Sequence, residues 1–239
     1  YTFKLSPTSN AESGKLSAEV NEESNTYNRS LQSIQHDHIP AQVIMPEAAC
    51  KLVYVNVETN KQKVGYLMGA GDEVPKALEQ LGYQVELLDA ENITLEILEQ
   101  YKTVVLGVRV YNTVENINNI HNTLLEYCNN GGKVITQYNT TGGLKSKIVG
   151  PYELTPSRDR ITDEFAPLKI LDPKHPIFNK PNKITKADFD NWVQERGLYF
   201  PSEFSEKYKP LLEGNDKDED PVNGMLLVTD YGKGQLVYT

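Results

Sequence analysis

Polar side chains end or follow two predicted strands of the sequence, residues 103–108 and 133–137. The first is a continuous apolar run of the length expected for a strand buried on both faces of a sheet. Ligands of open parallel sheets lie beyond the carboxyl ends of the strands, so these side chains stand where a ligand would be held. Their guanidinium, phenol and amide groups suit hydrogen-bonded recognition of a polar molecule. They are Arg109, Tyr111, Asn112, Gln137, Tyr138 and Asn139.

A long polar segment, residues 140–222, is predicted to cover that edge of the sheet and to add charged and aromatic side chains. Polar groups beside an aromatic ring are typical of a pocket for a sugar or another polar ligand. The alternative is an internal network, in which Arg109 or Arg196 pairs with Asp163 or Glu195 and fixes the segment to the sheet. The segment contributes Arg158, Arg160, Asp163, Glu164, Trp192, Gln194, Glu195 and Arg196. The ligand-binding set that we predict is Arg109, Tyr111, Asn112, Gln137, Asn139, Asp163, Glu164, Trp192, Glu195 and Arg196. Both interpretations stay open, and neither requires catalysis.

Acid–base catalysis is a further hypothesis for the same segment. Asp163, Glu164 or Glu195 could act with His175, because paired carboxylates can exchange protons when their environments separate their pKa values. No Ser or Cys nucleophile can be paired with His175 from the sequence. We therefore predict no catalytic residue, and whether the chain is an enzyme stays open.

Three shorter motifs favour structural roles. Gly69-Ala-Gly-Asp72 separates a predicted strand from a predicted helix, as a phosphate-binding turn would, but it lacks the third glycine of a dinucleotide site and a Walker lysine. We interpret it as a tight turn whose amides could still hold an anion. His36-Asp-His38 could place two imidazoles on one face of a strand, but no third ligand is near, so we predict no metal site and no cofactor. His121, inside a predicted helix, is expected at the surface.

Composition excludes some partners. The net charge of -9 argues against general binding to nucleic acid or to anionic membranes, because both need clustered Lys and Arg. No run approaches the ~18 apolar residues of a membrane span. The two cysteines, Cys50 and Cys128, form no metal or disulfide framework. Both ends of the sequence look cut, and we expect a fragment of a longer polypeptide.

The elements that would position the site fall into two regions. Residues 1–60 show short period-two alternation and are predicted to be a β-rich segment, the remnant of a β-sandwich or a linker. Residues 61–239 alternate strand and helix, which predicts an α/β domain with a mostly parallel sheet, interrupted by the covering insertion at 140–222. The predicted strands are 64–68, 84–88, 103–108 and 133–137, the predicted helices are 73–81, 95–101, 116–129 and 186–192, and a final hairpin joins 224–228 to 235–238.

Four stretches carry a resemblance to a known family. They are Val64–Asp72, Gly107–Thr113, Gln137–Thr140 and, the longest, Asp188–Pro201. Over roughly residues 30–239 the chain resembles the C-terminal region of large PIG-L/LmbE-type deacetylase proteins of Bacteroidetes. That region is similar to the class I glutamine amidotransferase fold, which is flavodoxin-like, with a mostly parallel sheet and helices on both faces.

The resemblance implies a role without catalysis. Deacetylation in such proteins belongs to a separate N-terminal domain with a zinc motif of the His-Pro-Asp-Asp type, which this sequence lacks. The amidotransferase likeness implies a Cys nucleophile after the fourth strand, where this chain has Gln137-Tyr-Asn-Thr-Thr141. Cys128 precedes that strand and is expected on the order of 15 Å away, at ~3.3 Å per residue. No thiolate is therefore expected for glutamine hydrolysis.

The function that we predict is a non-catalytic amidotransferase-like module of a carbohydrate-active envelope protein, periplasmic or secreted. It would bind a glycan or another small polar ligand, or scaffold its partner, the deacetylase domain of the same polypeptide. The alternatives are the hydrolase described above and a purely structural domain.

Overall fold

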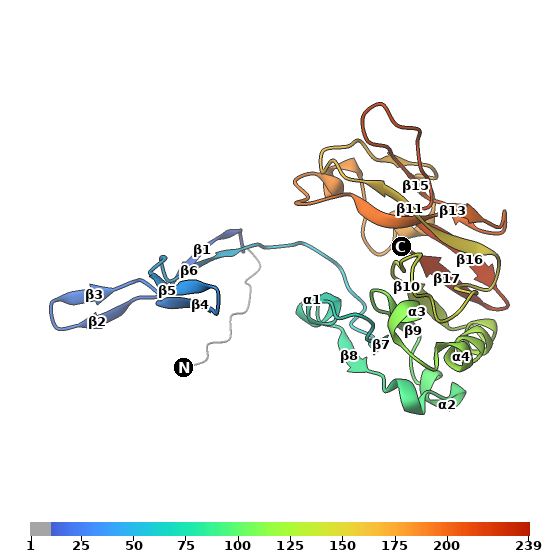
Figure 1. Ribbon diagram of the computed structural model, residues 1–239, viewed down its shortest axis with the longest axis horizontal. Helices are drawn as coiled ribbons and strands as arrows, with labels where there is room; N and C mark the ends of the chain where they lie inside the picture. Colours follow the sequence, from blue (N-terminus) through green and yellow to red (C-terminus); the bar gives the residue numbers. More distant parts are fainter. Residues whose placement is uncertain (1–10) are drawn as a thin grey trace. The chain divides into compact units, whose positions relative to one another are not determined.

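The computed structural model describes residues 11–239. The chain forms two compact units, the first ending at Val57 and the second beginning at Glu58 (Figure 1). All the residues of the predicted site belong to the second unit. None of the helices among the described residues is long and apolar enough to cross a membrane.

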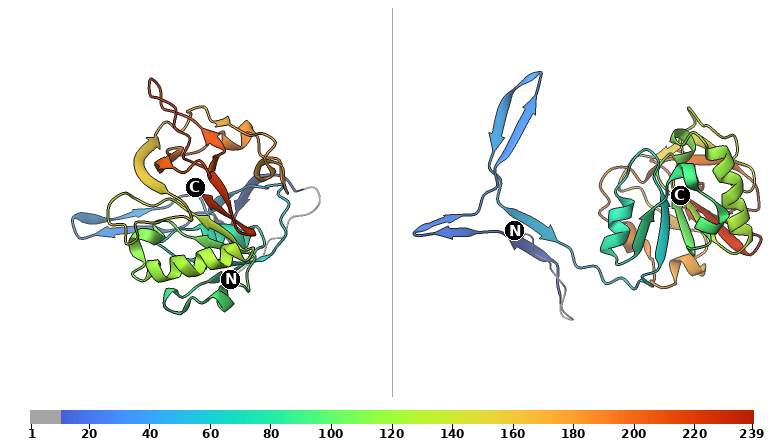
Figure 2. Two further views of the ribbon diagram at one scale, coloured as in Figure 1. Left: turned by 90° about the vertical axis from the view of Figure 1, so that its right-hand side faces the viewer. Right: turned by 90° about the horizontal axis from the view of Figure 1, so that it is seen from below.

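The first unit is made of paired strands without a buried interior. Its strands are β1 (Gly14–Ser17), β2 (Val20–Glu22), β3 (Asn25–Tyr27), β4 (Gln32–His36), β5 (Ile39–Ile44) and β6 (Ala49–Leu52). They form the antiparallel pairs β1–β6, β2–β3 and β4–β5, of which the last two are the separate blue hairpins of Figure 2. No residue between 11 and 57 is buried. The described part of this unit therefore has strands but not the packed faces of a sandwich.

The two histidines of the first unit lie together. The rings of His36 and His38 stack with centroids 5.7 Å apart. Within residues 11–239, no group of three or more His, Cys, Asp or Glu side chains is arranged to hold a metal ion.

The second unit is built on a seven-stranded sheet. Its strand order is β14–β16–β17–β10–β9–β7–β8. The strands are β7 (Lys63–Leu67), β8 (Gln84–Leu87), β9 (Thr103–Leu106), β10 (Lys133–Thr136), β14 (Lys209–Pro210), β16 (Leu227–Tyr231) and β17 (Gly234–Tyr238). β8, β7, β9, β10 and β17 are parallel neighbours, whereas β16 is antiparallel to β17 and β14 is antiparallel to β16.

The prediction of a mostly parallel, flavodoxin-like sheet is wrong, because the sheet is mixed. β16 returns directly into β17 through a tight turn at Gly232, whose φ is +59°, and no crossover helix separates the two strands. A direct return of this kind can only pair strands antiparallel. The final hairpin itself was correctly predicted, and it supplies the antiparallel side of the sheet.

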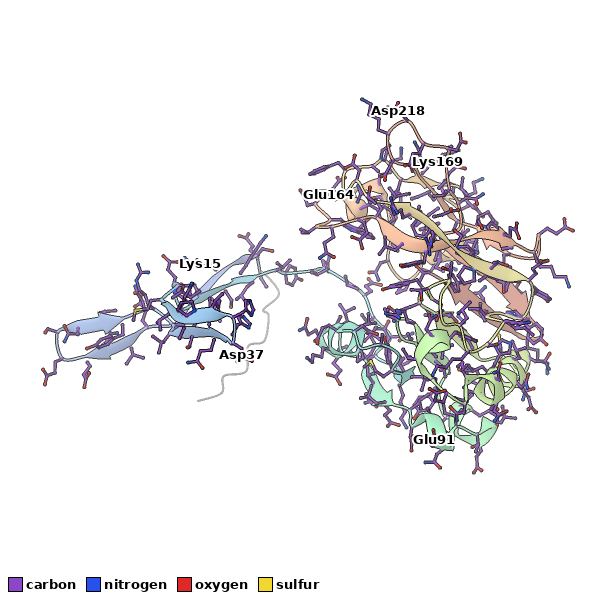
Figure 3. All side chains as sticks on the ribbon, viewed as in Figure 1. Lys15, Asp37, Glu91, Glu164, Lys169 and Asp218 are labelled. Atoms are coloured by element: carbon purple, nitrogen blue, oxygen red, sulfur yellow. The ribbon has the colours of Figure 1, made fainter. Side chains whose placement is uncertain are left out.

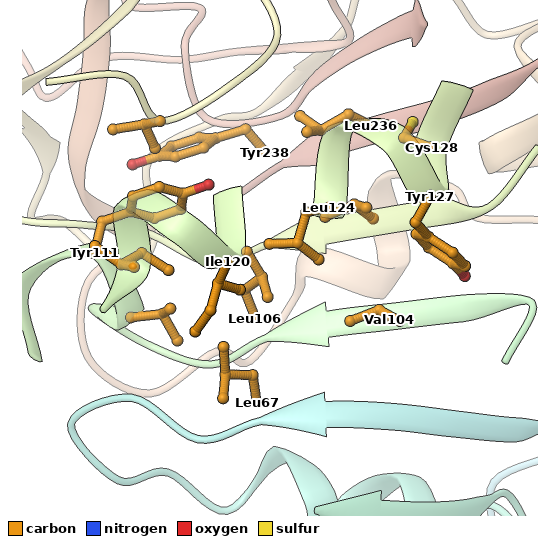
Figure 4. Packing of buried hydrophobic residues seen from close by; sticks show 14 of the residues in the cluster. Leu67, Val104, Leu106, Tyr111, Ile120, Leu124, Tyr127, Cys128, Leu236 and Tyr238 are labelled. Atoms are coloured by element: carbon orange, nitrogen blue, oxygen red, sulfur yellow. The ribbon is translucent and has the colours of Figure 1, made fainter. Parts of the chain in front are cut away.

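The helices before the covering segment are α1 (Val74–Gln80), η1 (Ala90–Asn92), α2 (Leu95–Leu98), α3 (Val110–Thr113) and α4 (Ile117–Asn129). The apolar pattern of the sequence predicted α1, α2 and α4, but neither η1 nor α3. α4 packs Ile120 and Leu124 into a core with Val104 and Leu106 of β9 (Figure 4). Val105, between those two strand residues, faces the opposite side and packs in the cluster that α1 covers. The alternation along β9 therefore sends side chains to two separate cores.

The covering segment, residues 140–222, is largely extended. It contains β11 (Leu154–Ile161), β12 (Lys169–Ile170), η2 (Pro176–Phe178), η3 (Lys186–Phe189), β13 (Gly197–Phe204) and β15 (Leu212–Glu213) besides β14. β11 and β13 pair antiparallel with several register shifts, and Figure 1 shows them as the gold and orange ribbon. Ile161, Phe200 and Leu211 belong to a hydrophobic core that also includes Val228 of β16. The helix predicted at 186–192 is the shorter 3-10 helix η3.

Candidate functional site

The chain turns sharply where β9 ends. Arg109 has a left-handed backbone, with φ of +61°, and stands at the start of α3. Its N–H donates to the carbonyl oxygen of Tyr138 at 2.9 Å, which ties the end of β9 to the end of β10. Its carbonyl oxygen accepts the N–H of Asn112 at 2.9 Å. The short helix α3, which the sequence pattern did not predict, therefore begins at the residue that was expected to face a ligand.

Three arginines converge on one pocket of about 510 Å³ beside this turn. Arg158 and Arg160 lie two positions apart on β11, so their side chains leave the same side of the strand. The complete lining is Arg109, Thr140, Thr141, Gly142, Arg158, Arg160, Leu198 and Tyr199. No carboxylate is among these described lining residues. We call this hollow the arginine pocket.

The charge of the arginine pocket is only partly compensated. Arg109 Nε is buried, and no hydrogen-bond partner for it exists within residues 11–239. Arg160 contributes to lowering the pKa of Asp216, although hydrogen bonds from Thr162 are the larger cause. The ion pairs found in the described chain join lysines to acids, and none involves Arg109, Arg158 or Arg160. The pocket therefore presents three guanidinium groups to whatever enters it.

Asn112 holds one wall of the arginine pocket and is itself buried. Its Nδ2 donates to the carbonyl oxygens of Thr140 at 3.1 Å and Gly142 at 3.0 Å. Its Oδ1 accepts the N–H of Thr140 at 3.0 Å. All these bonds fix loop 140–142, so Asn112 positions the pocket wall and leaves no group free for a ligand.

The side chains of Tyr111 and Asn139 also form hydrogen bonds within the chain. Asn139 Oδ1 accepts the N–H of Tyr111 at 2.9 Å, and Asn139 Nδ2 donates to the carbonyl oxygen of Gln137 at 3.0 Å. The Tyr111 hydroxyl and His121 Nδ1 lie 2.9 Å apart and hydrogen bond. Both Tyr111 and Asn139 are almost completely buried. For these two residues the internal-network interpretation describes the structure, and neither of them lines the arginine pocket.

His121 is buried, and the expectation of a surface position is wrong because its partner Tyr111 lies inside the core. Burial lowers its pKa. The unfolded chain therefore binds the proton more readily, and we expect stability to fall as pH drops below about 6.5, the ordinary pKa of histidine. The test is the free energy of unfolding at pH 7.5 and 5, measured for the wild type and His121→Gln. The wild type should lose more stability, by at most about 1.4 kcal/mol per pH unit, and identical losses would contradict the assignment.

The turn Gly69–Asp72 after β7 is held by the side-chain carboxylate of Asp72. Asp72 accepts the Tyr66 hydroxyl at 2.6 Å and the N–H groups of Val74 at 3.0 Å and Val108 at 3.2 Å. Gln137 completes the network by donating from Nε2 to the Tyr66 oxygen at 2.7 Å. Burial, with Asp72 second, raises the pKa of Tyr66. Since Asp72 takes amides that an anion would need, the tight-turn interpretation fits the structure.

The remaining predicted residues do not meet at the arginine pocket. Trp192 and Arg196 line a second hollow, whereas Asp163, Glu164 and Glu195 line neither. Asp163 closes a turn by accepting the N–H of Phe165 at 2.8 Å, and Figure 3 shows Glu164 on the periphery of the covering segment. The predicted ion pairs between Arg109 or Arg196 and these acids do not occur among the described residues.

The histidine and the carboxylates of the hydrolase hypothesis do not form hydrogen bonds with one another among the described residues. His175 begins η2, where its Nδ1 accepts the N–H of Ile177 at 3.3 Å. No hydrogen bond within residues 11–239 links His175 to Asp163, Glu164 or Glu195.

Cys128 lies on α4, away from the carboxyl tip of β10. It is buried, and its Sγ is 3.9 Å from the carbonyl oxygen of Tyr231. Burial raises its pKa to about 11, so the thiol stays protonated near neutral pH. A buried thiol of this kind is not an activated nucleophile.

The sequence pattern missed several residues of the arginine pocket. Arg158 and Arg160 were placed in the covering segment but outside the predicted ligand set; their spacing of two within an extended stretch was the available signal. No sequence pattern marked Thr140, Thr141 and Tyr199 as pocket residues. Their position beside the arginines depends on the pairing of β11 with β13 and on the loop that Asn112 holds.

Comparison with known proteins supports the fold only. No protein-family model matches the chain, and no curated protein matches it. A β-galactosidase from Bacillus circulans sp. alkalophilus is similar over 75% of this chain and 28% of its own, with 15% identity and a TM-score of 0.50. The mmIFT52 N-terminal domain covers 73% of this chain and 84% of its own, with 12% identity and a TM-score of 0.50. A ThuA-like protein of Bacteroides uniformis covers 77% and 84%, with 12% identity and a TM-score of 0.43.

Proposed function

We propose that this chain is a non-catalytic module that binds a polar ligand carrying an acid group. An acidic sugar, either a uronate or a sulfated sugar, is the ligand class that fits best. The observation that carries the proposal is the composition of the arginine pocket. The chain has five arginines and 19 lysines, and three of the arginines but no lysine line this hollow.

Arginine at this position suits a carboxylate or a sulfate. Its planar fork can donate two parallel hydrogen bonds to such a group, and each charge-assisted bond is worth roughly 1.5–3 kcal/mol. Thr140 and Thr141 add hydroxyl groups and Tyr199 adds a ring, which are the partners of a hydroxylated molecule. A volume of about 510 Å³ lies within the usual range for small-ligand sites, about 300–1,000 Å³.

Backbone strain at the arginine pocket supports a functional role. Arg109 and Tyr199 both have left-handed backbones, with φ of +61° and +56°. A residue with a Cβ held there costs roughly 1–2 kcal/mol. Strained residues cluster where side-chain placement matters more than stability. Glycine would remove the strain at either position, and the chain keeps an arginine and a tyrosine instead.

The resemblance of the sequence to deacetylase-associated regions extends the proposal. In such a protein the module would hold an acidic glycan, or dock the deacetylase domain, outside the cytoplasm. The buried Cys128 and the separated carboxylates support binding over turnover.

The test is a calorimetric titration with methyl β-D-glucuronide and with its neutral twin, methyl β-D-glucoside. The wild type should bind the acid with a dissociation constant near or below about 1 mM, and bind the neutral sugar far more weakly. Arg109→Gly should be at least as stable as the wild type but should not bind. Lys147→Ala, which removes an exposed charge elsewhere, should bind normally. Equal heats from the two sugars, or no heat from either, would count against the proposal.

A further inference from the structure

A second hollow of about 130 Å³ lies in the same unit and has a different character. Leu168, Phe200, Leu212 and Met225 contribute buried apolar surface to it. The complete lining is Tyr138, Leu168, Phe189, Trp192, Arg196, Gly197, Leu198, Phe200, Leu212, Met225 and Thr239. We call it the apolar slot.

The apolar slot adjoins the arginine pocket. Leu198 lines both hollows. Tyr138 of the slot stacks on Tyr199 of the arginine pocket, with ring centroids 5.9 Å apart and an angle of 12° between the rings. The two hollows are therefore adjacent, with Leu198 common to both linings.

Trp192 is held in place although it is not buried, with 41% of its surface exposed. Its indole N–H donates to the carbonyl oxygen of Asp188 at 3.2 Å, and Phe189 packs on it with ring centroids 5.6 Å apart. The guanidinium of Arg196 lies 5.7 Å from its ring. A fixed, partly exposed ring at the edge of a hollow is a surface on which a ligand can pack.

Arg196, the one charged side chain among the described residues that line the apolar slot, already donates hydrogen bonds within the chain. Arg196 Nε donates to the carbonyl oxygen of Ala166 at 3.1 Å, and another guanidinium nitrogen donates to that of Phe189. Arg196 therefore fixes the slot instead of offering its donors to an acid. An uncharged group suits the slot better than a second acid.

We propose that the apolar slot is a second subsite, which takes a ring-sized apolar group of the ligand whose acid lies in the arginine pocket. This inference rests on the proposed function and narrows it to acidic sugars or other small acids that carry an aromatic group. The size is suitable, since a cavity of about 150 Å³ lined by Leu, Ile and Phe binds benzene.

The test compares methyl and phenyl β-D-glucuronide, which share the acid and differ in the ring. Partial burial of the phenyl group should give about tenfold tighter binding to the wild type. Trp192 is the single tryptophan of the chain, so protein fluorescence should change with the phenyl compound and stay constant with the methyl compound. Trp192→Ala should reduce the affinity ratio to about one, while Val193→Ala, at a neighbouring exposed residue outside the slot, should keep it.

The outcomes separate the two proposals. Equal affinities with an unchanged fluorescence would overturn the second subsite and leave acid binding in place. Failure of both compounds to bind would overturn the proposed function, and this inference with it.

Discussion

Replacing Arg158 and Arg160 together by alanine is expected to weaken methyl β-D-glucuronide binding by at least about 100-fold. Two charge-assisted contacts of roughly 1.5–3 kcal/mol each would be lost. Stability should change little, by about 0.5 kcal/mol, because both side chains are exposed and neither takes part in a hydrogen bond of the described chain. Calorimetric titration and thermal unfolding of the same samples measure both quantities.

A control variant with the same change in net charge distinguishes direct contacts in the arginine pocket from the long-range electrostatic attraction of the whole protein. Lys147→Ala with Lys174→Ala also removes two exposed positive charges, at positions outside the arginine pocket. That variant should bind the glucuronide within about twofold of the wild type, since an exposed charge that does not line the pocket acts on the ligand through solvent, where salt screens it. If both double variants lost the same affinity, long-range attraction would explain binding and the arginine pocket would not be needed.

Asn112→Ala is expected to lower the free energy of unfolding by about 3 kcal/mol. The substitution removes three hydrogen bonds and leaves the N–H and the carbonyl oxygen of Thr140 without their partner, whereas the Gly142 carbonyl oxygen keeps the Thr140 hydroxyl. An unsatisfied buried polar group costs roughly 1–3 kcal/mol, and water reaching the loop would recover part of it. Denaturant unfolding of the purified chain is the measurement.

Asn118→Ala is the matched control for Asn112→Ala. Asn118 is exposed and donates one hydrogen bond, from Nδ2 to the carbonyl oxygen of Lys145 at 2.8 Å. It should cost less than about 1 kcal/mol. If Asn112→Ala kept wild-type stability and lost only binding, Asn112 would be a ligand contact, as the sequence pattern predicted, and not the support of the pocket wall.

The local elements of this fold could be read from the sequence. The apolar face of α4 and the apolar run of β9 follow periodicities that any globular context would bury. The strands of the covering segment could not be read in the same way. β14 and β12 are two residues long, and the pairing of β11 with β13 shifts register several times, so they leave no periodic signature.

The sequence predicted the location of the candidate site but not most of the residues that line it. The rule that ligands lie beyond strand ends led to Arg109, which does line the arginine pocket. The same rule selected Tyr111, Asn112 and Asn139, whose side chains turn inward to hold the loops. Whether a polar side chain at a strand end faces a ligand or a neighbouring backbone depends on tertiary contacts that a single sequence does not encode locally. The resemblance to deacetylase-associated proteins remains a prediction.

The most direct measurement follows the arginine side chains themselves. The Nε–H signals of a ¹⁵N-arginine-labelled sample, assigned by single Arg→Lys variants, would be recorded during titration with methyl β-D-glucuronide. The five arginines of the chain provide an internal control, since Arg29 and Arg196 lie outside the arginine pocket. The signals of Arg109, Arg158 and Arg160 are expected to shift together along one saturation curve. Shifts confined to Arg29 or Arg196, or no shift at a concentration where calorimetry detects binding, would contradict this expectation.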